Sequence, residues 1–127
     1  MHRVLMPVTA LLISTDFENS FDHSRFCYEA TEIAQTANRD LGKWLDEFTR
    51  HHGVAVDCDA RSIETKLFVR LAFKDIPGNW QDRTNFKWNE DYCNDPAWHA
   101  AIDNQWQVLL TVTSSVDEAA RFRAECH

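Results

Sequence analysis

The hydrophobic residues between Asp22 and Gly53 repeat with a helical period. They follow one another at intervals of three or four residues, which places them on one stripe of a helix: Phe26, Ala30, Ile33, Ala37, Leu41, Trp44 and Phe48. Gly53 is a typical residue for the end of a helix. Gly42 costs about 1 kcal/mol in a helix interior, so a break near Asn38–Asp40 is an alternative. The pattern predicts one long helix.

Four other segments carry strand patterns. Val54 to Cys58 and Ile63 to Phe73 alternate between apolar and polar positions, and a short turn near 60–62 separates them, which predicts a hairpin. Residues 4–14 are apolar at both parities, which predicts a strand covered on both faces. Residues 106–112 alternate again and predict a further strand.

Two shorter helices follow from capping patterns. Asp95 and Pro96 match an N-cap followed by proline at the first helical position, and the helix is expected to reach Asp103. The segment 115–118 (Ser-Val-Asp-Glu) matches a capping box and predicts a C-terminal helix. Most of the segment between Ile76 and Asp95 shows no clear period and is expected to be a long connection.

The predicted element order is β-α-β-β-(loop, short α)-β-α. This order resembles the ferredoxin-like split βαβ arrangement with an added C-terminal helix. We therefore expect a single α+β domain over residues 1–127, with an antiparallel sheet that carries one long helix. A sheet of another strand order is the alternative. Residues 76–104 would be an insertion or lid.

The second face of such a sheet would be apolar. It would present Leu11, Ile13, Phe68, Ala72 and Leu109. A patch of this kind seldom stays bare on a soluble monomer. We expect either the 76–104 segment or a second copy of the chain to cover it, and we favour a homodimer.

Composition narrows the function classes. The chain has 127 residues, of which 44% are hydrophobic and 26% charged, as in globular proteins. The net charge of −7 argues against binding to nucleic acid through phosphates. No run of about 18 apolar residues is present, so no membrane span is expected. Residues 75–127 hold most of the excess acid, which can serve either recognition of a basic partner or solubility.

The cysteines bear on the cellular compartment. Cys27, Cys58, Cys93 and Cys126 are far apart in the sequence. A chain of this length does not need disulfides, so we expect reduced thiols and a cytoplasmic protein. Residues 4–13 resemble a signal peptide only faintly, because the apolar run is short and broken by Pro7, and a strand is the preferred interpretation.

Aromatic residues concentrate in one part of the chain. Four of the five tryptophans lie between Trp80 and Trp106, with five asparagines in and beside this Trp-rich segment. Aromatic rings together with amides suit a ligand site. The candidate binding residues are Trp80, Trp88, Tyr92, Trp98, His99 and, from the sheet, Phe68. The alternative is that these rings pack on the sheet and are structural, and Trp106 is expected in the core.

A catalytic site has weaker support. His99 and Asp103 lie four residues apart on a predicted helix, so Asp103 can orient His99 as a general base, with Cys93 as a nucleophile. A surface ion pair is the plainer interpretation. His23, Cys27, Cys93 and His99 contain ligand types for zinc but lack the usual spacings, so no metal and no cofactor are expected.

Three functions follow from these features. The first is a non-catalytic binding module that encloses a small, partly apolar or cationic ligand between the sheet and a Trp-rich lid. The second is an acidic inhibitor or adaptor that acts on a basic protein partner. The third and weakest is a small enzyme that uses His99 and Asp103. Nucleic acid and membranes are not expected as partners.

Overall fold

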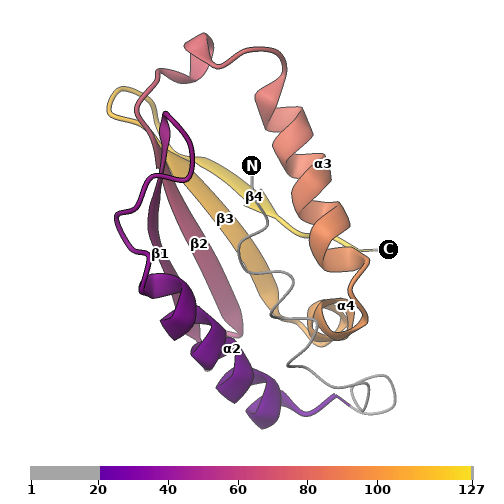
Figure 1. Cartoon of the computed structure of the whole chain (residues 1–127). Helices are drawn as coiled ribbons and strands as arrows, with labels where there is room; N and C mark the ends of the chain where they lie inside the picture. Colours follow the sequence, from indigo (N-terminus) through magenta and orange to yellow (C-terminus); the bar gives the residue numbers. More distant parts are fainter. Residues whose placement is uncertain (1–20, 127) are drawn as a thin grey trace.

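The computed structural model describes residues 21–126, so the strand expected at residues 4–14, with Leu11 and Ile13, lies outside the described residues. Within them a four-stranded mixed sheet packs against three α-helices (Figure 1). The α+β class is therefore confirmed. The elements are α2 (His23–Asn38), β1 (Thr49–Asp57), β2 (Ser62–Val69), the 3₁₀ helix η2 (Phe73–Asp75), α3 (Trp80–Cys93), α4 (Pro96–Asp103), β3 (Gln107–Thr113) and β4 (Ala120–Arg123).

The strands follow one another in space in the order of the sequence. β1 pairs with β2 and β3 pairs with β4 in antiparallel fashion, whereas β2 and β3 are parallel. The expectation of a wholly antiparallel sheet is wrong, and the ferredoxin-like order is not confirmed. Two parallel neighbours need a crossover connection that returns the chain to the same end of the sheet. Residues 70–106, which include α3 and α4, provide it.

The first helix is shorter than predicted. The buried stripe of α2 includes Phe26 and Ala30 and ends at Ala37, whereas Leu41 and Trp44 are 58% and 49% exposed. Gly42 has a φ of 87°, which belongs to a turn and not to a helix. The chain therefore leaves the helix after Asn38 and enters β1 at Thr49. The break that we considered near Asn38–Asp40 is what occurs.

Gly53 lies within β1 and does not end a helix. The register of β1 against β2 shifts between His51 and Val54, and Gly53 has a φ of 111° at this bulge. The buried His51 ring accepts a hydrogen bond at Nδ1 from the Gly53 N–H (3.3 Å). Its Nε2 therefore donates to the carbonyl oxygen of Ala37 (3.0 Å), which ties β1 to the last turn of α2.

Asn38 closes part of the free edge of β1. Its Oδ1 accepts from the Val54 N–H (2.7 Å), and its Nδ2 donates to the Val54 carbonyl (2.9 Å). One side chain thus satisfies both backbone groups of an edge residue. An edge treated in this way cannot pair with another chain at that point.

The Trp-rich segment is mostly helical. Its inward side consists of Trp80, Thr84, Trp88 and Tyr92, which are four residues apart. The polar Thr84 interrupts this stripe and Phe86 points outward, which explains why the sequence showed no period. α4 begins as predicted, because the Asp95 carboxylate accepts from the N–H groups of Ala97 and Trp98. The hairpin β1–β2 and the strand β3 are also confirmed.

The predicted C-terminal helix is wrong. Ala120–Arg123 form β4, in which Phe122 is buried opposite Leu110 of β3. The polar residues of the expected capping box belong to a turn: Ser114 Oγ accepts from the Asp117 N–H and donates to the Asp117 carboxylate. That carboxylate also accepts from the Phe73 N–H (2.8 Å), which joins this turn to the start of η2.

All three helices cover the same face of the sheet. One cluster joins α2 and α4 to the sheet through rings that meet edge to face, with Phe26 5.2 Å from Trp98 and 4.9 Å from Trp106. A second cluster places Trp80 and Trp88 of α3 beside Leu110 and Phe122. Figure 1 shows α2 along the β1 side and α3 along the β4 side. The Trp-rich segment therefore does not cover the opposite face, as the lid hypothesis required.

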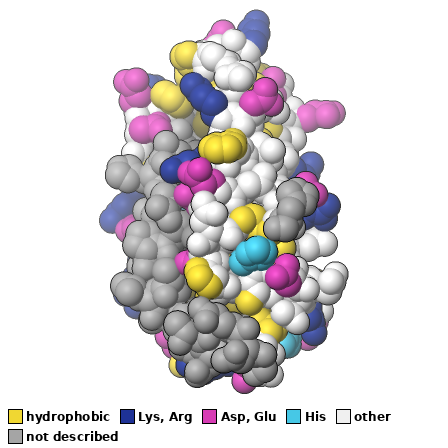
Figure 2. All heavy atoms as spheres, turned by 90° about the vertical axis from the view of Figure 1, so that its right-hand side faces the viewer, with side chains coloured by type: hydrophobic (Ala, Val, Ile, Leu, Met, Phe, Trp, Pro, Cys, Tyr) yellow, Lys and Arg dark blue, Asp and Glu magenta, His cyan; other side chains and the backbone are white. Residues whose placement is uncertain are grey.

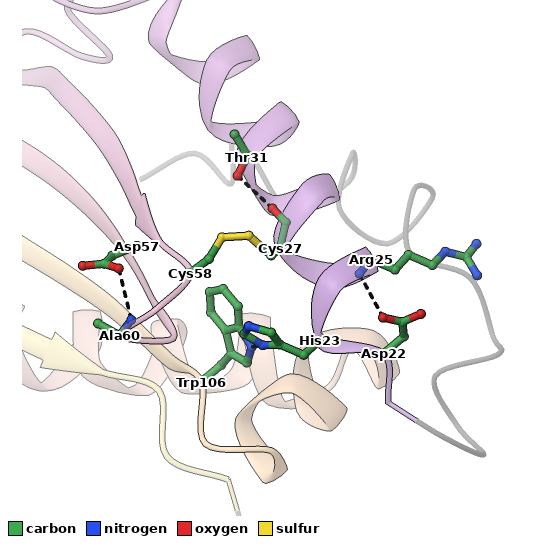
Figure 3. Close-up of a disulfide and its surroundings, with 9 residues drawn as sticks. All are labelled: Asp22, His23, Arg25, Cys27, Thr31, Asp57, Cys58, Ala60 and Trp106. Carbon is green, nitrogen blue, oxygen red and sulfur yellow. Dashed lines mark hydrogen bonds between the residues drawn. A yellow bond between two sulfur atoms is a disulfide. The ribbon is translucent and has the colours of Figure 1, made fainter.

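Two disulfides tie the elements together, so the prediction of reduced thiols is wrong. Cys27 of α2 bonds to Cys58 in the turn after β1, beside Trp106 and His23 (Figure 3). Cys93 at the end of α3 bonds to Cys126 after β4. The Cα atoms are 5.8 and 5.4 Å apart, within the usual range.

We predict that Asn38→Ala lowers the free energy of unfolding by about 1–2 kcal/mol, because it leaves both backbone groups of Val54 without their partner. Chemical denaturation of the variant measures this change. Gln35→Ala, at an exposed position of the same helix, is the matched control and should have little effect. Equal stabilities for the two variants would contradict the role of Asn38 as an edge clamp.

We predict that Trp98→Ala lowers the free energy of unfolding by about 3–5 kcal/mol, because the Trp98 side chain is 1% exposed at the centre of the first cluster. Phe86→Ala is the control, since Phe86 is 67% exposed, and its effect should stay within about 0.5 kcal/mol. Urea denaturation followed by circular dichroism compares the two. A small effect of Trp98→Ala would refute its structural role.

Candidate functional site

The predicted binding residues do not form one site. Tyr92 and Trp98 are buried and meet edge to face at 5.1 Å. Trp88 is half-buried, and its Nε1 donates to the Val108 carbonyl (3.1 Å), which fastens α3 to β3. Trp106 is in the core, as predicted. Most tryptophans of the segment therefore hold helices on the sheet.

Phe68 lies on the other side of the sheet. Residues alternate between the two faces of a strand, and Leu67 and Val69 face the helices, so Phe68 faces away from them. Its ring stacks on His52 of β1, with centroids 5.3 Å apart. Phe68 therefore cannot share a pocket with the Trp-rich segment.

Among the predicted binding residues, Trp80 borders a hollow. Its ring packs on Phe73 (4.9 Å) and Phe122 (6.1 Å) at the start of α3 and is half-buried. The hollow beside it has a volume of about 300 Å³ and is open to solvent. It is lined by Phe73, Lys74, Ile76, Gly78, Asn79, Trp80, Gln81 and Asp82.

The loop that forms this hollow is held at both ends. The Phe73 N–H donates to the Asp117 carboxylate, and Arg83 Nη2 donates to the Pro77 carbonyl (3.1 Å). Gly78 has a φ of 69°, a conformation that glycine adopts without strain. The sequence signal for this site is the Ile-Pro-Gly-Asn run ahead of Trp80, which we interpreted only as part of a long connection.

The candidate catalytic residues are not assembled as expected. His99 Nε2 lies 3.7 Å from an Asp103 carboxylate oxygen, and both side chains are substantially exposed, as in a surface ion pair. Cys93 is in a disulfide and is not a free thiol. Cys27 and Cys93 belong to different disulfides, so the zinc ligand set also cannot form. Within residues 21–126 no group of three or more His, Cys, Asp or Glu side chains is arranged for a metal.

The helical side of the molecule carries mixed charges. Lys87 lies 3.9 Å from Glu90 and 3.7 Å from Asp91, which offsets part of the acid on α3. On the side of the molecule where α3 lies, the hydrophobic side chains form small separate groups among polar ones (Figure 2). On α2, a hydrogen bond to Glu32 and the negative charge of that carboxylate raise the pKa of the exposed Tyr28.

The face of the sheet that points away from the helices carries a group of three cations, which the sequence analysis did not identify. We call it the outer face. It carries Lys66, Arg121 and Arg123, all exposed, on β2 and β4. The sequence holds a signal for this group, because each of these cations occupies one of the alternate, polar positions of its strand. The negative net charge of the whole chain drew attention away from it.

Comparisons with known proteins give a fold but no family. No family model matches the chain, and no curated protein matches it. The crystal structure of a putative secreted protein from Pseudomonas aeruginosa is similar, with a TM-score of 0.60. The two are 12% identical over 78% of this chain and 88% of the other. At this identity the likeness shows a shared fold alone.

The predicted cytoplasmic location is wrong. Disulfides form and persist in oxidising environments outside the cytoplasm, and this chain has two. The similar Pseudomonas aeruginosa protein is described as a putative secreted protein. None of the helices in the described part of the chain is long and apolar enough to cross a membrane. The chain is a disulfide-bonded α+β protein that shares its fold with that structure.

Proposed function

We propose that the protein is a non-catalytic binding domain of an oxidising, extracellular compartment that holds a small, partly apolar ligand beside Trp80. The observation that carries this proposal is the hollow of about 300 Å³ bordered by the half-buried Trp80 ring. This volume is at the lower end for small-molecule sites, so the ligand is small. The site lies at the start of α3 and replaces the lid that the sequence led us to expect.

The lining has two chemical parts. Phe73, Ile76 and Trp80 offer apolar surface, while Asn79 and Gln81 offer amides that both donate and accept hydrogen bonds. Within residues 21–126 the Trp80 indole N–H has no acceptor, so it is free to donate to a ligand. A molecule with one apolar face and one hydrogen-bonding edge fits this lining.

A cationic group on the ligand is also favoured. Asp82 lines the hollow beside Trp80, and an aromatic ring together with a carboxylate attracts a cation. Lys74 also lines the hollow, and its positive charge repels a ligand that carries several cationic groups. We therefore expect a ligand with a single cationic or strongly polar group.

The hollow is formed before a ligand arrives. The bond from Phe73 to Asp117 and the bond from Arg83 to Pro77 fix its loop, and Trp80 packs on Phe122 of β4. Little ordering of the protein is then needed on binding, which favours affinity. The exposed His99–Asp103 pair and the oxidised Cys93 support binding over the enzymatic alternative.

An adaptor for a basic protein is the second candidate function. It would use the acidic residues of α3 near the exposed Phe86. Lys87 already pairs with Glu90 and Asp91, which weakens this surface as a site for cations. The Trp80 hollow is therefore the better supported site.

Native mass spectrometry of the protein purified from its host should show a bound small molecule. Calorimetric titration with choline, glycine betaine, phenol and glucose then tests the ligand chemistry. We predict that Trp80→Leu weakens binding of the co-purified ligand, or of the best of these probes, at least tenfold. Trp44→Leu is the control, because Trp44 is an exposed tryptophan that does not line the hollow, and it should leave affinity unchanged.

Asp82→Asn removes the charge of this side chain and keeps its shape, so it tests the role of the charge alone. It also replaces Trp80→Leu as the test of the site if that variant does not fold. It should weaken a cationic probe and leave a neutral one unaffected. Unchanged affinity in a folded Trp80→Leu variant would reject the site. The absence of both a co-purified ligand and any probe binding would reject the proposed function.

A further inference from the structure

The outer face of the sheet carries cations that have no partner among the described residues. Lys66 of β2 is opposite Thr111 of β3, which is in turn opposite Arg121 of β4. Arg123 lies two residues further along β4, opposite Leu109. Within residues 21–126 the side chains of these three cations form no hydrogen bond and no ion pair.

Several cations elsewhere in the molecule are paired. Arg25 pairs with Glu29, Lys43 with Asp40, and Lys87 with two carboxylates of its own helix. Lys66, Arg121 and Arg123 have no such partners among the described residues, although the net charge of the chain is −7. Their concentration on one face instead leaves a positive surface on an acidic protein.

The spacing of these cations is fixed by the sheet. Adjacent strands are about 4.8 Å apart, so Lys66 and Arg121, two strands apart, have Cα atoms about 10 Å apart. Arg121 and Arg123 are about 7 Å apart along one strand. The pattern is a rigid triangle, because its backbone positions belong to two strands, β2 and β4, that are both hydrogen-bonded to β3.

The outer face is not uniformly positive. Glu64 lies two residues from Lys66 on β2, and its carboxylate accepts a hydrogen bond from the Thr111 hydroxyl. Phe68 adds an aromatic ring stacked on His52. Arginine and aromatic side chains with interspersed polar groups are typical of protein interfaces.

This mixture argues for one class of partner. A polyanionic chain or an anionic lipid surface would bring negative charge against Glu64 as well as against the cations. A second copy docked face to face would oppose like charges across its two-fold axis. A different, folded protein can place carboxylates opposite the cations and a donor opposite Glu64.

We propose that the outer face binds an acidic protein partner through Lys66, Arg121 and Arg123. Carboxylates of the partner pair with these three cations, and an apolar group covers Phe68. This surface is on the side of the sheet away from the helices and does not depend on the Trp80 hollow.

Photocrosslinking in the host identifies the partner. A benzophenone amino acid placed at Gln107 or Thr113, both of which point out of the outer face, should crosslink the full chain to one acidic protein. The same probe at the exposed Phe86, on the helical side, should not capture that protein. Mass spectrometry then identifies the crosslinked partner.

Purified components test the charges. The triple variant Lys66→Glu/Arg121→Glu/Arg123→Glu should bind the identified partner at least tenfold more weakly than the natural chain, and added salt should weaken the natural complex. The control Arg39→Glu/Lys43→Glu/Lys87→Glu makes the same change in net charge away from the outer face and should retain affinity. If the triple variant is misfolded by circular dichroism, Arg121→Gln replaces it, with a threefold or larger loss expected.

Several results would overturn the proposal. Crosslinking of the outer-face probes to a second copy of the chain would assign the surface to self-association. Retention of the natural chain by heparin or by phosphatidylglycerol vesicles, without a protein crosslink, would assign it to polyanions or lipid. Equal loss of affinity in the triple variant and its control would show that net charge alone acts.

Discussion

The parallel pairing of β2 and β3 is the constraint on which the rest of the structure depends. Parallel neighbours require a crossover connection that returns the chain to the same end of the sheet. Residues 70–106, which include α3 and α4, form this connection. They do so on the side already occupied by α2. One face of the sheet thereby receives all the helices of the described chain, and the other receives none.

Both proposed surfaces follow from this arrangement. The hollow beside Trp80 lies where the crossover begins, at the junction between η2 and α3. The outer face is free for charged side chains because the crossover uses the opposite side. The tryptophans serve the crossover itself: Trp88 bonds to the β3 backbone, while Trp98 and Trp106 close the space between α4, α2 and the sheet.

Periodic patterns in the sequence predicted the elements whose apolar residues are uninterrupted. The hairpin, β3 and the start of α4 are of this kind. α3 escaped prediction because Thr84 occupies the buried stripe between Trp80 and Trp88 while Phe86 faces solvent. The end of α2 depends on the hydrogen bonds of Asn38 to Val54 and of His51 to Ala37. A helical pattern of apolar residues cannot predict such contacts between residues far apart in the sequence.

Other features rest on contacts between distant parts of the chain. Phe122 satisfies both a helical and a strand pattern, and only its pairing opposite Leu110 decides between them. The paired cysteines are 31 and 33 residues apart, and nothing in the sequence indicates that they form disulfides. The cellular compartment, which we inferred from reduced thiols, was therefore predicted wrongly. Of the candidate site residues, only Trp80 borders the hollow. Sequence could identify it as an aromatic in a loop-rich segment but could not separate it from Trp88 or Trp98.

The positions of the two disulfides have a consequence for survival among extracellular proteases. Exposed turns are the usual sites of proteolytic cleavage, and two of them lie at residues 39–47 and 115–118. A cut in the first turn leaves α2 attached to the hairpin through Cys27–Cys58. A cut in the second leaves β4 attached to α3 through Cys93–Cys126. Each bond thus spans one of these two turns, and a molecule that is cut at either turn keeps all its described elements.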